Sequence, residues 1–441
     1  MAEHIFHYFN SPFFKKKAGG GNSVDISNLS LFLQSSKLSD LLKSCDFYSV
    51  QTPAATMPKK PVVTACYAFK GGVGKSTTCI NLAAVMAHEK KQRVLLIDAD
   101  PQCNTTSAVF SEELSKMSVE DLEKTPGFLT PNLSHIMDDP TFHLSLNAKA
   151  IEQYAEKIKP RSFKKEIPHT ESTCFVLPGS VDIIAFEYQY AAIASTVDSG
   201  RFVLAGSFYA HIKLMCDELN IDYVFIDFGP SASPMYLNWL SNCDYIIPPC
   251  FPDYFNVSSI NSLLTKILPL MLKNLEEFKT YQQEYLNLSK QPPPFKKSKL
   301  TLQQDACGNK SLPKDILLYD YCKLLDRTPQ LLPILMTKLS GNSAESPFIT
   351  AVEKLLKSPT KLPHEVQQML SPKSQHNSMV LQFLPDVGQL FQLAQSQHQL
   401  ISYANVDDST LQVNQKTFLS QFIMLADMII KKNSNKRKHT V

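Results

Sequence analysis

The segment 70–77 reads KGGVGKST and holds the residue types that bind nucleotide phosphates. Glycines allow successive backbone N–H groups to turn toward phosphate oxygens, and a helix that begins at Lys75 adds the positive end of its dipole. Lys75 supplies a charge for the β- and γ-phosphates, and the Ser76 hydroxyl is the expected Mg²⁺ ligand. The strict pattern GxxxxGK[ST] is not met, because Phe69 occupies the position of the first glycine. The predicted phosphate-binding residues are Gly71, Gly72, Val73, Gly74, Lys75, Ser76 and Thr77.

Three carboxylates follow apolar runs that are typical of buried strands. Asp98 and Asp100 come after residues 93–97, and Asp227 ends the run 223–226. Ligands of parallel sheets bind at the carboxyl ends of the strands, so these side chains are expected to face the phosphates. Asp227 has the character of a carboxylate that holds Mg²⁺ through water. A lone aspartate at a strand end is commonly a helix cap, but three of them beside a glycine-rich loop favour the phosphate site.

The elements around these residues predict an α/β fold. The apolar, β-rich run 62–69 precedes the glycine-rich turn, residues 77–89 have a helical pattern, and 93–98 is a second apolar run. Strand, turn, helix and strand in this order form a βαβ unit, so we expect a mostly parallel central sheet flanked by helices. Further strands are predicted at 174–178, 222–227, 244–249, 332–337 and 379–384, with helices at 208–219 and 417–430.

The chain divides into three predicted parts. Residues 1–60 are expected to form an N-terminal extension with a flexible Lys- and Gly-rich linker, and 61–430 to form one domain around the phosphate-binding loop. Helical or loop insertions are expected near 110–170 and 275–325, where prolines and polar residues interrupt the strand pattern. Residues 431–441 are a basic tail, and a second cluster of lysines lies at 296–299. Either could contact a phosphate backbone, although a solvated charged surface is the simpler reading.

The composition narrows the class of protein. Of 441 residues, 44% are hydrophobic and 19% are charged, which favours a folded chain with a sizeable core. The net charge of +3 is nearly balanced, so overall charge does not indicate a nucleic-acid binder. The ten cysteines form no close CxxC pair, which argues against a zinc site or a disulfide framework. With neither a signal-peptide pattern nor a long apolar run, we expect a cytoplasmic protein without stable membrane insertion.

Three motifs together resemble the ParA/MinD family of deviant-Walker P-loop ATPases, and specifically its ParA branch. They are KGGVGKST with its extra Lys70, the DxDPQ box at 98–102, and the Walker B segment DFGPS at 227–231. Weaker likeness at 177–182, 334–337 and 384–396 extends the resemblance over about 61–430.

The resemblance implies roles for individual residues. Family members form dimers that enclose two ATP molecules, so Lys70 would reach the partner subunit's phosphates, as an arginine finger does. Asp100 would position the attacking water, and Asp98 would lie near the metal shell. The implied catalytic residues are Lys70, Lys75, Asp98 and Asp100; the implied metal ligands are Ser76, Asp98 and Asp227; and Met336 and Thr337 would lie near the adenine.

The resemblance also implies partners. We expect ATP and Mg²⁺ as cofactors, a homodimer on ATP binding, and a ParB-like or other small protein that stimulates slow hydrolysis. The family commonly binds DNA without sequence preference and segregates plasmids or chromosomes or positions cargo, so association with the nucleoid is implied. Two departures bear on this: Gly229 stands where relatives often have a proline, and residues 386–390 lack the arginines that help relatives bind DNA.

Other readings remain open at this point. A MinD-like positioning ATPase that associates with membranes would use a C-terminal amphipathic helix, and the apolar run 418–430 followed by Lys431 and Lys432 has that order. A biosynthetic relative with the same type of loop would need a further substrate pocket or a nucleophile. A nucleotide-binding scaffold with little turnover would need no complete set of catalytic residues.

Overall fold

The computed structural model describes most of the compact unit Lys59–Val441. The described residues are 60–111, 116, 174–177, 179, isolated positions between 183 and 216, 219–289, 328–337, 347–356, 362–370, 380–382 and 387–438. The predicted extension 1–60 lies outside them apart from its last residue. So do nearly all of the predicted insertion 110–170 and the lysine cluster 296–299.

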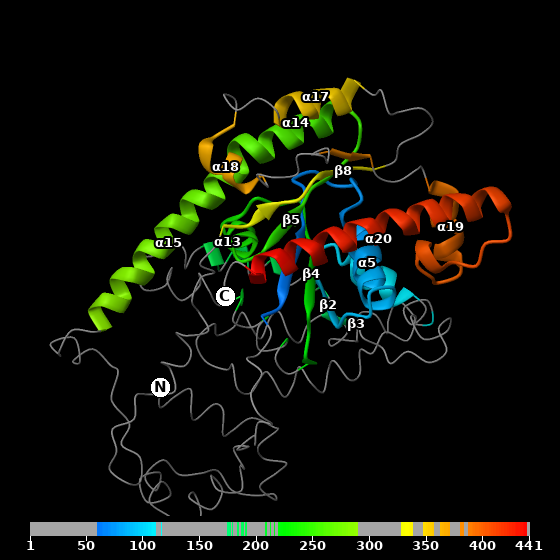
Figure 1. Ribbon diagram of the computed structural model, residues 1–441, viewed down its shortest axis with the longest axis horizontal. Helices are drawn as coiled ribbons and strands as arrows, with labels where there is room; N and C mark the ends of the chain where they lie inside the picture. The colour runs from blue at the N-terminus through cyan, green and yellow to red at the C-terminus, as the bar shows by residue number, and fades with distance from the viewer. Residues whose placement is uncertain are drawn as a thin grey trace, which may run out of the picture. The chain divides into compact units, whose positions relative to one another are not determined.

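A six-stranded sheet forms the centre of the described fold, with the order β3-β2-β4-β1-β5-β7 (Figure 1). Every neighbouring pair in this sheet is parallel, which confirms the predicted fold class. Buried, β-branched and aromatic residues form these strands, as expected for a sheet that is covered on both faces. The strands are β1 (Val62–Cys66), β2 (Val94–Ala99), β3 (Cys174–Leu177), β4 (Tyr223–Phe228), β5 (Tyr245–Ile247) and β7 (Gln330–Leu331).

A second parallel sheet of three strands contains β6 (Pro249–Cys250), β8 (Ile334–Met336) and β9 (Val380–Gln382). The strand expected at 244–249 is therefore divided between the two sheets, and the one expected at 332–337 is preceded by a short strand of the other sheet. Pro248 separates β5 from β6, and Pro333 separates β7 from β8. Since proline has no backbone N–H to donate to a ladder, each proline allows the chain to leave one sheet and join the other.

Two layers of helices cover the two faces of the central sheet. On one face α5 (Lys75–His88) packs with α20 (Ser409–Lys438) over alternate residues of β1, β2 and β4. On the other face the intervening residues of the same strands pack against α13 (Pro234–Ser241) and the start of α15 (Leu268–Ser289). The remaining helical segments are α6 (Asn104–Val109), α14 (Tyr254–Ser262), the π-helix η3 (Leu263–Ile267), α17 (Pro347–Leu356), α18 (His364–Met369), α19 (Gly388–Ser396) and the 3₁₀-helix η6 (Ile401–Tyr403).

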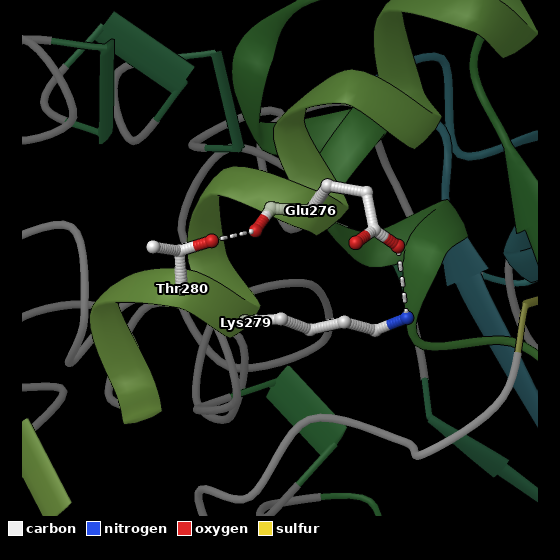
Figure 2. A network of polar contacts seen from close by, with 3 residues as sticks. All are labelled: Glu276, Lys279 and Thr280. Carbon is white, nitrogen blue, oxygen red and sulfur yellow. Dashed lines mark hydrogen bonds and ion pairs between the residues drawn. The ribbon is translucent and has the colours of Figure 1, made fainter. Parts of the chain in front are cut away.

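Two helices are longer than their patterns predicted. Helix α20 extends the expected 417–430 in both directions, into the predicted basic tail, and its apolar face is buried in the core through Phe418, Phe422 and Ile429. Helix α15 continues to Ser289, into the predicted insertion near 275–325. On its exposed surface Lys279 pairs with Glu276 at 3.2 Å (Figure 2). Such local i,i+3 contacts support a polar helix that a search for apolar periodicity does not detect.

No helix among the described residues has the length and apolar character needed to cross a membrane. The seven cysteines within these residues are all buried free thiols, as their scattered spacing predicted.

Candidate functional site

The glycine-rich turn lies between β1 and α5, at the carboxyl edge of the central sheet. Gly72 and Gly74 have φ angles of 75° and 86°, a region that residues with a side chain rarely adopt. A Cβ atom on Gly71 or Gly72 would meet nothing within 4 Å, so the turn faces open space there. Helix α5 begins at Lys75 without a side-chain cap, which leaves its first N–H groups available to an anion.

Lys75 points back over this turn. Its Nζ donates a hydrogen bond to the carbonyl oxygen of Lys70 at 3.0 Å, and the residue is only 5% exposed. Burial lowers the pKa of Lys75, while the negative charges of Asp227 and Asp100 oppose that shift. The ammonium group is thus held between the loop and the carboxylates, where a phosphate would replace the carbonyl as its partner.

Asp98 and Asp227 are direct neighbours across β2 and β4 and are both fully buried. Burial raises the pKa of Asp98 to about 6 and that of Asp227 to about 7, because the charged form of each loses solvation. Hydrogen bonds from Ser76 and Thr105 to Asp227 oppose this shift. Within the described residues, Asp227 Oδ1 has no hydrogen-bond partner. A buried carboxylate oxygen without a hydrogen-bond partner is unfavourable, and a cation or a water molecule bound to that cation can supply the missing interaction.

Asp98 accepts hydrogen bonds at both of its carboxylate oxygens. Its Oδ2 accepts from both the backbone N–H and the hydroxyl of Thr106, each at 2.7 Å, and its Oδ1 accepts from the backbone N–H of Asp100 at 3.2 Å. A Cβ on Gly179 would come within 2.9 Å of Asp98 Cγ, so the end of β3 also closes over this side chain. Asp98 therefore holds α6 against β2. That Asp98 also lies near the metal shell stays a prediction.

Asp100 and Gly229 meet on the other side of the site. Asp100 is buried, and its Oδ1 accepts a hydrogen bond from the N–H of Gln102 at 2.9 Å. A Cβ on Gly229 would lie 3.1 Å from both Pro101 Cδ and Tyr236 Oη, and 3.3 Å from Asp100 Oδ1. The close approach of these groups leaves little room for a side chain at position 229.

Lys70 lies apart from the other charged groups of the loop. Its Nζ is 5.0 Å from the centre of the Phe255 ring, and Phe255 is 70% exposed. Desolvation tends to raise the pKa of nearby Asp253, but hydrogen bonds from Asn256 and the positive charge of Lys70 hold it below its usual value. Lys70 thus rests at the surface on the start of α14, held by a cation–π contact and a carboxylate.

Met336 and Thr337 lie at the end of β8, and both are buried. The Thr337 hydroxyl is within hydrogen-bonding distance of the carbonyl oxygens of Val73, at 3.1 Å, and Cys250, at 3.3 Å. A Cβ on Gly74 would be 3.7 Å from the Thr337 methyl group. Thr337 therefore supports the glycine-rich turn from behind, and contact of either residue with an adenine ring stays a prediction.

Sequence reasoning missed several residues of the site. Thr105 donates to Asp227 Oδ2 at 2.7 Å, and Thr106 donates to Asp98. The Tyr236 hydroxyl donates to the carbonyl oxygen of Ala99 at 2.7 Å. The two threonines directly follow the DxDPQ box, so their position was a signal, but only the folded helix α6 shows which carboxylate each one meets.

The donor set fits a magnesium ion. Ser76 and Asp227 offer oxygen atoms only, and Oδ1 of Asp227 has no hydrogen-bond partner within the described residues. In the part of the chain that the structure describes, no three carboxylate, thiol or imidazole groups form a ready metal cage. Mg²⁺ needs no such cage, because it keeps several waters and completes its shell with substrate phosphates.

Part of the chain is similar to known proteins. Residues 62–279 match the model of a family described as an AAA domain. An uncharacterized protein of Methanocaldococcus jannaschii is 29% identical over 210 residues, which are 47% of this chain and 65% of that protein. The chromosome-partitioning ATPase Soj of Thermus thermophilus is 29% identical over 198 residues, 45% of this chain and 58% of Soj. The chain thus spans less than two thirds of the length of these relatives.

Among solved structures, a protein from Corynebacterium diphtheriae overlays with a TM-score of 0.45 at 18% identity, over 69% of this chain and 89% of that one. The family match and the relatives agree with the resemblance seen in the motifs: residues 62–279 are similar to an AAA domain of the ParA/MinD type.

Proposed function

We propose that this chain is an ATPase that dimerises on binding ATP and acts as a molecular switch in DNA partition or cargo positioning. The proposal rests on the groups that meet at the carboxyl edge of the central sheet. There the glycine-rich turn, the start of α5, Lys75 and Asp227 converge around a loop that faces open space. A turn of this kind with a buried lysine and a strand-end carboxylate serves phosphate binding with a metal ion.

The proposed binding roles follow from these positions. The backbone N–H groups of residues 71–77 surround the β- and γ-phosphates, and Lys75 exchanges its carbonyl partner for a phosphate oxygen. Ser76 and Asp227 hold Mg²⁺, the first directly and the second through water. When bound, the metal neutralises charge on the phosphates. Contact of Met336 and Thr337 with the adenine belongs to this proposal as well.

The proposed catalytic roles divide between two subunits. Asp100 orients the attacking water within its own subunit, and buried Asp98 fixes the loop that carries Asp100 through its hydrogen bond to the Asp100 N–H. Lys70 acts on the phosphates of the partner subunit. Its contact with the exposed ring of Phe255 supports a role outside its own site. In this arrangement hydrolysis depends on dimer formation.

The proposed biological role rests on the relatives. One of them is named a chromosome-partitioning ATPase, and another, 54% identical over 50 residues, is named a maintenance of carboxysome distribution protein. We infer the same kind of work here, with a ParB-like or other small protein as the stimulating partner. Binding of DNA without sequence preference would need a surface other than the start of α19, where Val387, Gln389 and Leu390 carry no charge.

The position of α20 argues against the alternative of a MinD-like ATPase that binds membranes through its C-terminal helix. The apolar side chains of α20 that would enter a bilayer pack instead against α5 and the sheet. A nucleotide-binding scaffold with little turnover is the alternative that the following experiment decides.

The experiment measures ATP binding, ATP hydrolysis and molecular mass by gel filtration with ATP and Mg²⁺. The proposal expects saturable binding, slow hydrolysis whose specific rate rises with protein concentration, and a dimer that appears with ATP but not with ADP. Tight binding with no hydrolysis at any protein concentration would identify the scaffold instead. Absence of ATP binding would overturn the proposal entirely.

A further inference from the structure

Two adjacent threonines each bind a different buried carboxylate of the site. Thr105 and Thr106 open α6, directly after the loop that leaves β2. Consecutive residues of a helix point about 100° apart, so one hydroxyl reaches β4 and the other reaches β2. Thr105 donates to Asp227 and Thr106 donates to Asp98, both at 2.7 Å.

We propose that Thr105 is a positioning residue for metal binding: it fixes the Asp227 carboxylate so that one oxygen stays available to the Mg²⁺ shell. This inference rests on the proposed function of the site. Thr105 and Asp227 are both fully buried, so water cannot replace the hydroxyl if it is lost. The hydrogen bond engages Oδ2, while Oδ1 has no partner within the described residues. The carboxylate is thus held at one oxygen and open at the other.

The side chain of Thr105 suits this task better than a smaller or more flexible donor. A β-branched residue in a helix has few χ1 rotamers, so its hydroxyl has a set direction. Ser76, which also lowers the pKa of Asp227, lies in the first turn of α5 beside the expected phosphates, whereas Thr105 lies on the separate helix α6. Thr105 can therefore keep its hydrogen bond to Asp227 while Ser76 changes partner.

A merely structural role is the competing explanation, since any buried carboxylate benefits from a donor. The two roles differ in what they affect. A structural hydroxyl changes only the stability of the fold, whereas a positioning hydroxyl changes how strongly Mg²⁺ improves nucleotide binding. Thr64 provides a matched control: it is buried in β1, and its hydroxyl makes no hydrogen bond within the described part of the chain.

The test measures the affinity of the full chain for a fluorescent ATP analogue, in EDTA and in a Mg²⁺ series. The variants are Thr105→Val, Thr105→Ser and Thr64→Val, and thermal melting is recorded for each. Loss of a buried hydrogen bond to a charged group predicts that Thr105→Val raises the Mg²⁺ concentration for half-maximal effect by about tenfold. The affinity in EDTA should change little. Thr105→Ser retains the donor and should stay within about threefold of the unaltered chain, and Thr64→Val should match it.

Two outcomes would overturn the inference. One is an unaltered Mg²⁺ response in folded Thr105→Val, with only the melting temperature lowered. The other is a loss in Thr105→Ser as large as in Thr105→Val, which would assign the effect to packing. If the unaltered chain shows no Mg²⁺-dependent binding of the analogue at all, the proposed function fails rather than the role of Thr105.

Discussion

Replacement of Lys70 by alanine tests whether hydrolysis requires two subunits. Lys70 makes a cation–π contact with the exposed ring of Phe255, whereas the ammonium of Lys75 interacts with the carboxylates of Asp227 and Asp100. An exposed contact of this kind contributes about 0.5–1 kcal/mol. Lys70→Ala should therefore change the melting temperature little and leave ATP affinity within about threefold.

The expected effect on hydrolysis is much larger. A cation supplied to the transferred phosphoryl group by another subunit contributes about 10³–10⁵ in rate. Lys70→Ala should lower the turnover rate by an amount near that range, with ATP binding retained. The measurement is phosphate release at saturating ATP, over a series of protein concentrations.

Mixing two inactive variants shows which subunit supplies the lysine. A heterodimer of Lys70→Ala with Asp100→Ala has one site with both groups, provided that Lys70 acts across the interface and Asp100 acts within its own subunit. Random pairing of equal amounts makes about half of the dimers heterodimers, so about a quarter of the activity should return. If both groups act within one subunit, the mixture stays inactive. Normal hydrolysis by Lys70→Ala alone would also refute the reasoning.

Further outcomes are expected from other positions. Lys75→Ala should abolish ATP binding, measured with a fluorescent analogue, because the buried ammonium is the loop's partner for the phosphates. Asp100→Ala should accumulate an ATP-bound dimer on gel filtration, and elution as a monomer would contradict its assignment. Gly229→Ala should cost about 1–3 kcal/mol in a denaturant titration, since its Cβ would lie 3.1 Å from Pro101 Cδ and Tyr236 Oη. The raised pKa of Asp227, about 7 through burial, means that the folded chain takes up a proton as pH falls through about 7. The ligand-free chain should therefore gain stability between pH 8 and 6, by more than an Asp227→Asn variant gains, and equal gains would dismiss this linkage.

The local sequence determined the site to a large extent. A glycine run that follows a buried strand and opens a helix is explained most simply as a phosphate-binding loop. Gly72 and Gly74 do adopt the positive φ angles that only glycine tolerates easily. Continuous apolar runs likewise predicted β1, β2 and β4, because a parallel sheet buries both faces, and the βαβ unit predicted that the sheet is parallel.

Features that depend on contacts between distant segments were not accessible in this way. Both the partition of strands at Pro248 and Pro333 and the length of α20 follow from what each segment packs against, not from its own pattern. The same holds for Asp98, which the sequence grouped with the metal ligands. The fold directs it to Thr106, at 2.7 Å, and encloses it beneath Gly179.

The residue types and their order along the chain thus determined that a phosphate site exists and where it lies. The tertiary structure decided the task of each carboxylate, because hydrogen bonds and burial depend on which elements meet at the edge of the sheet. Asp98 and Asp227 are chemically identical and neighbours in register, yet one has both oxygens engaged and the other keeps one oxygen open within the described residues. Helix α6 supplies a threonine to Oδ2 of each carboxylate, and the difference lies at Oδ1, which accepts from the backbone N–H of Asp100 in Asp98 but has no such partner in Asp227 within the described part of the chain.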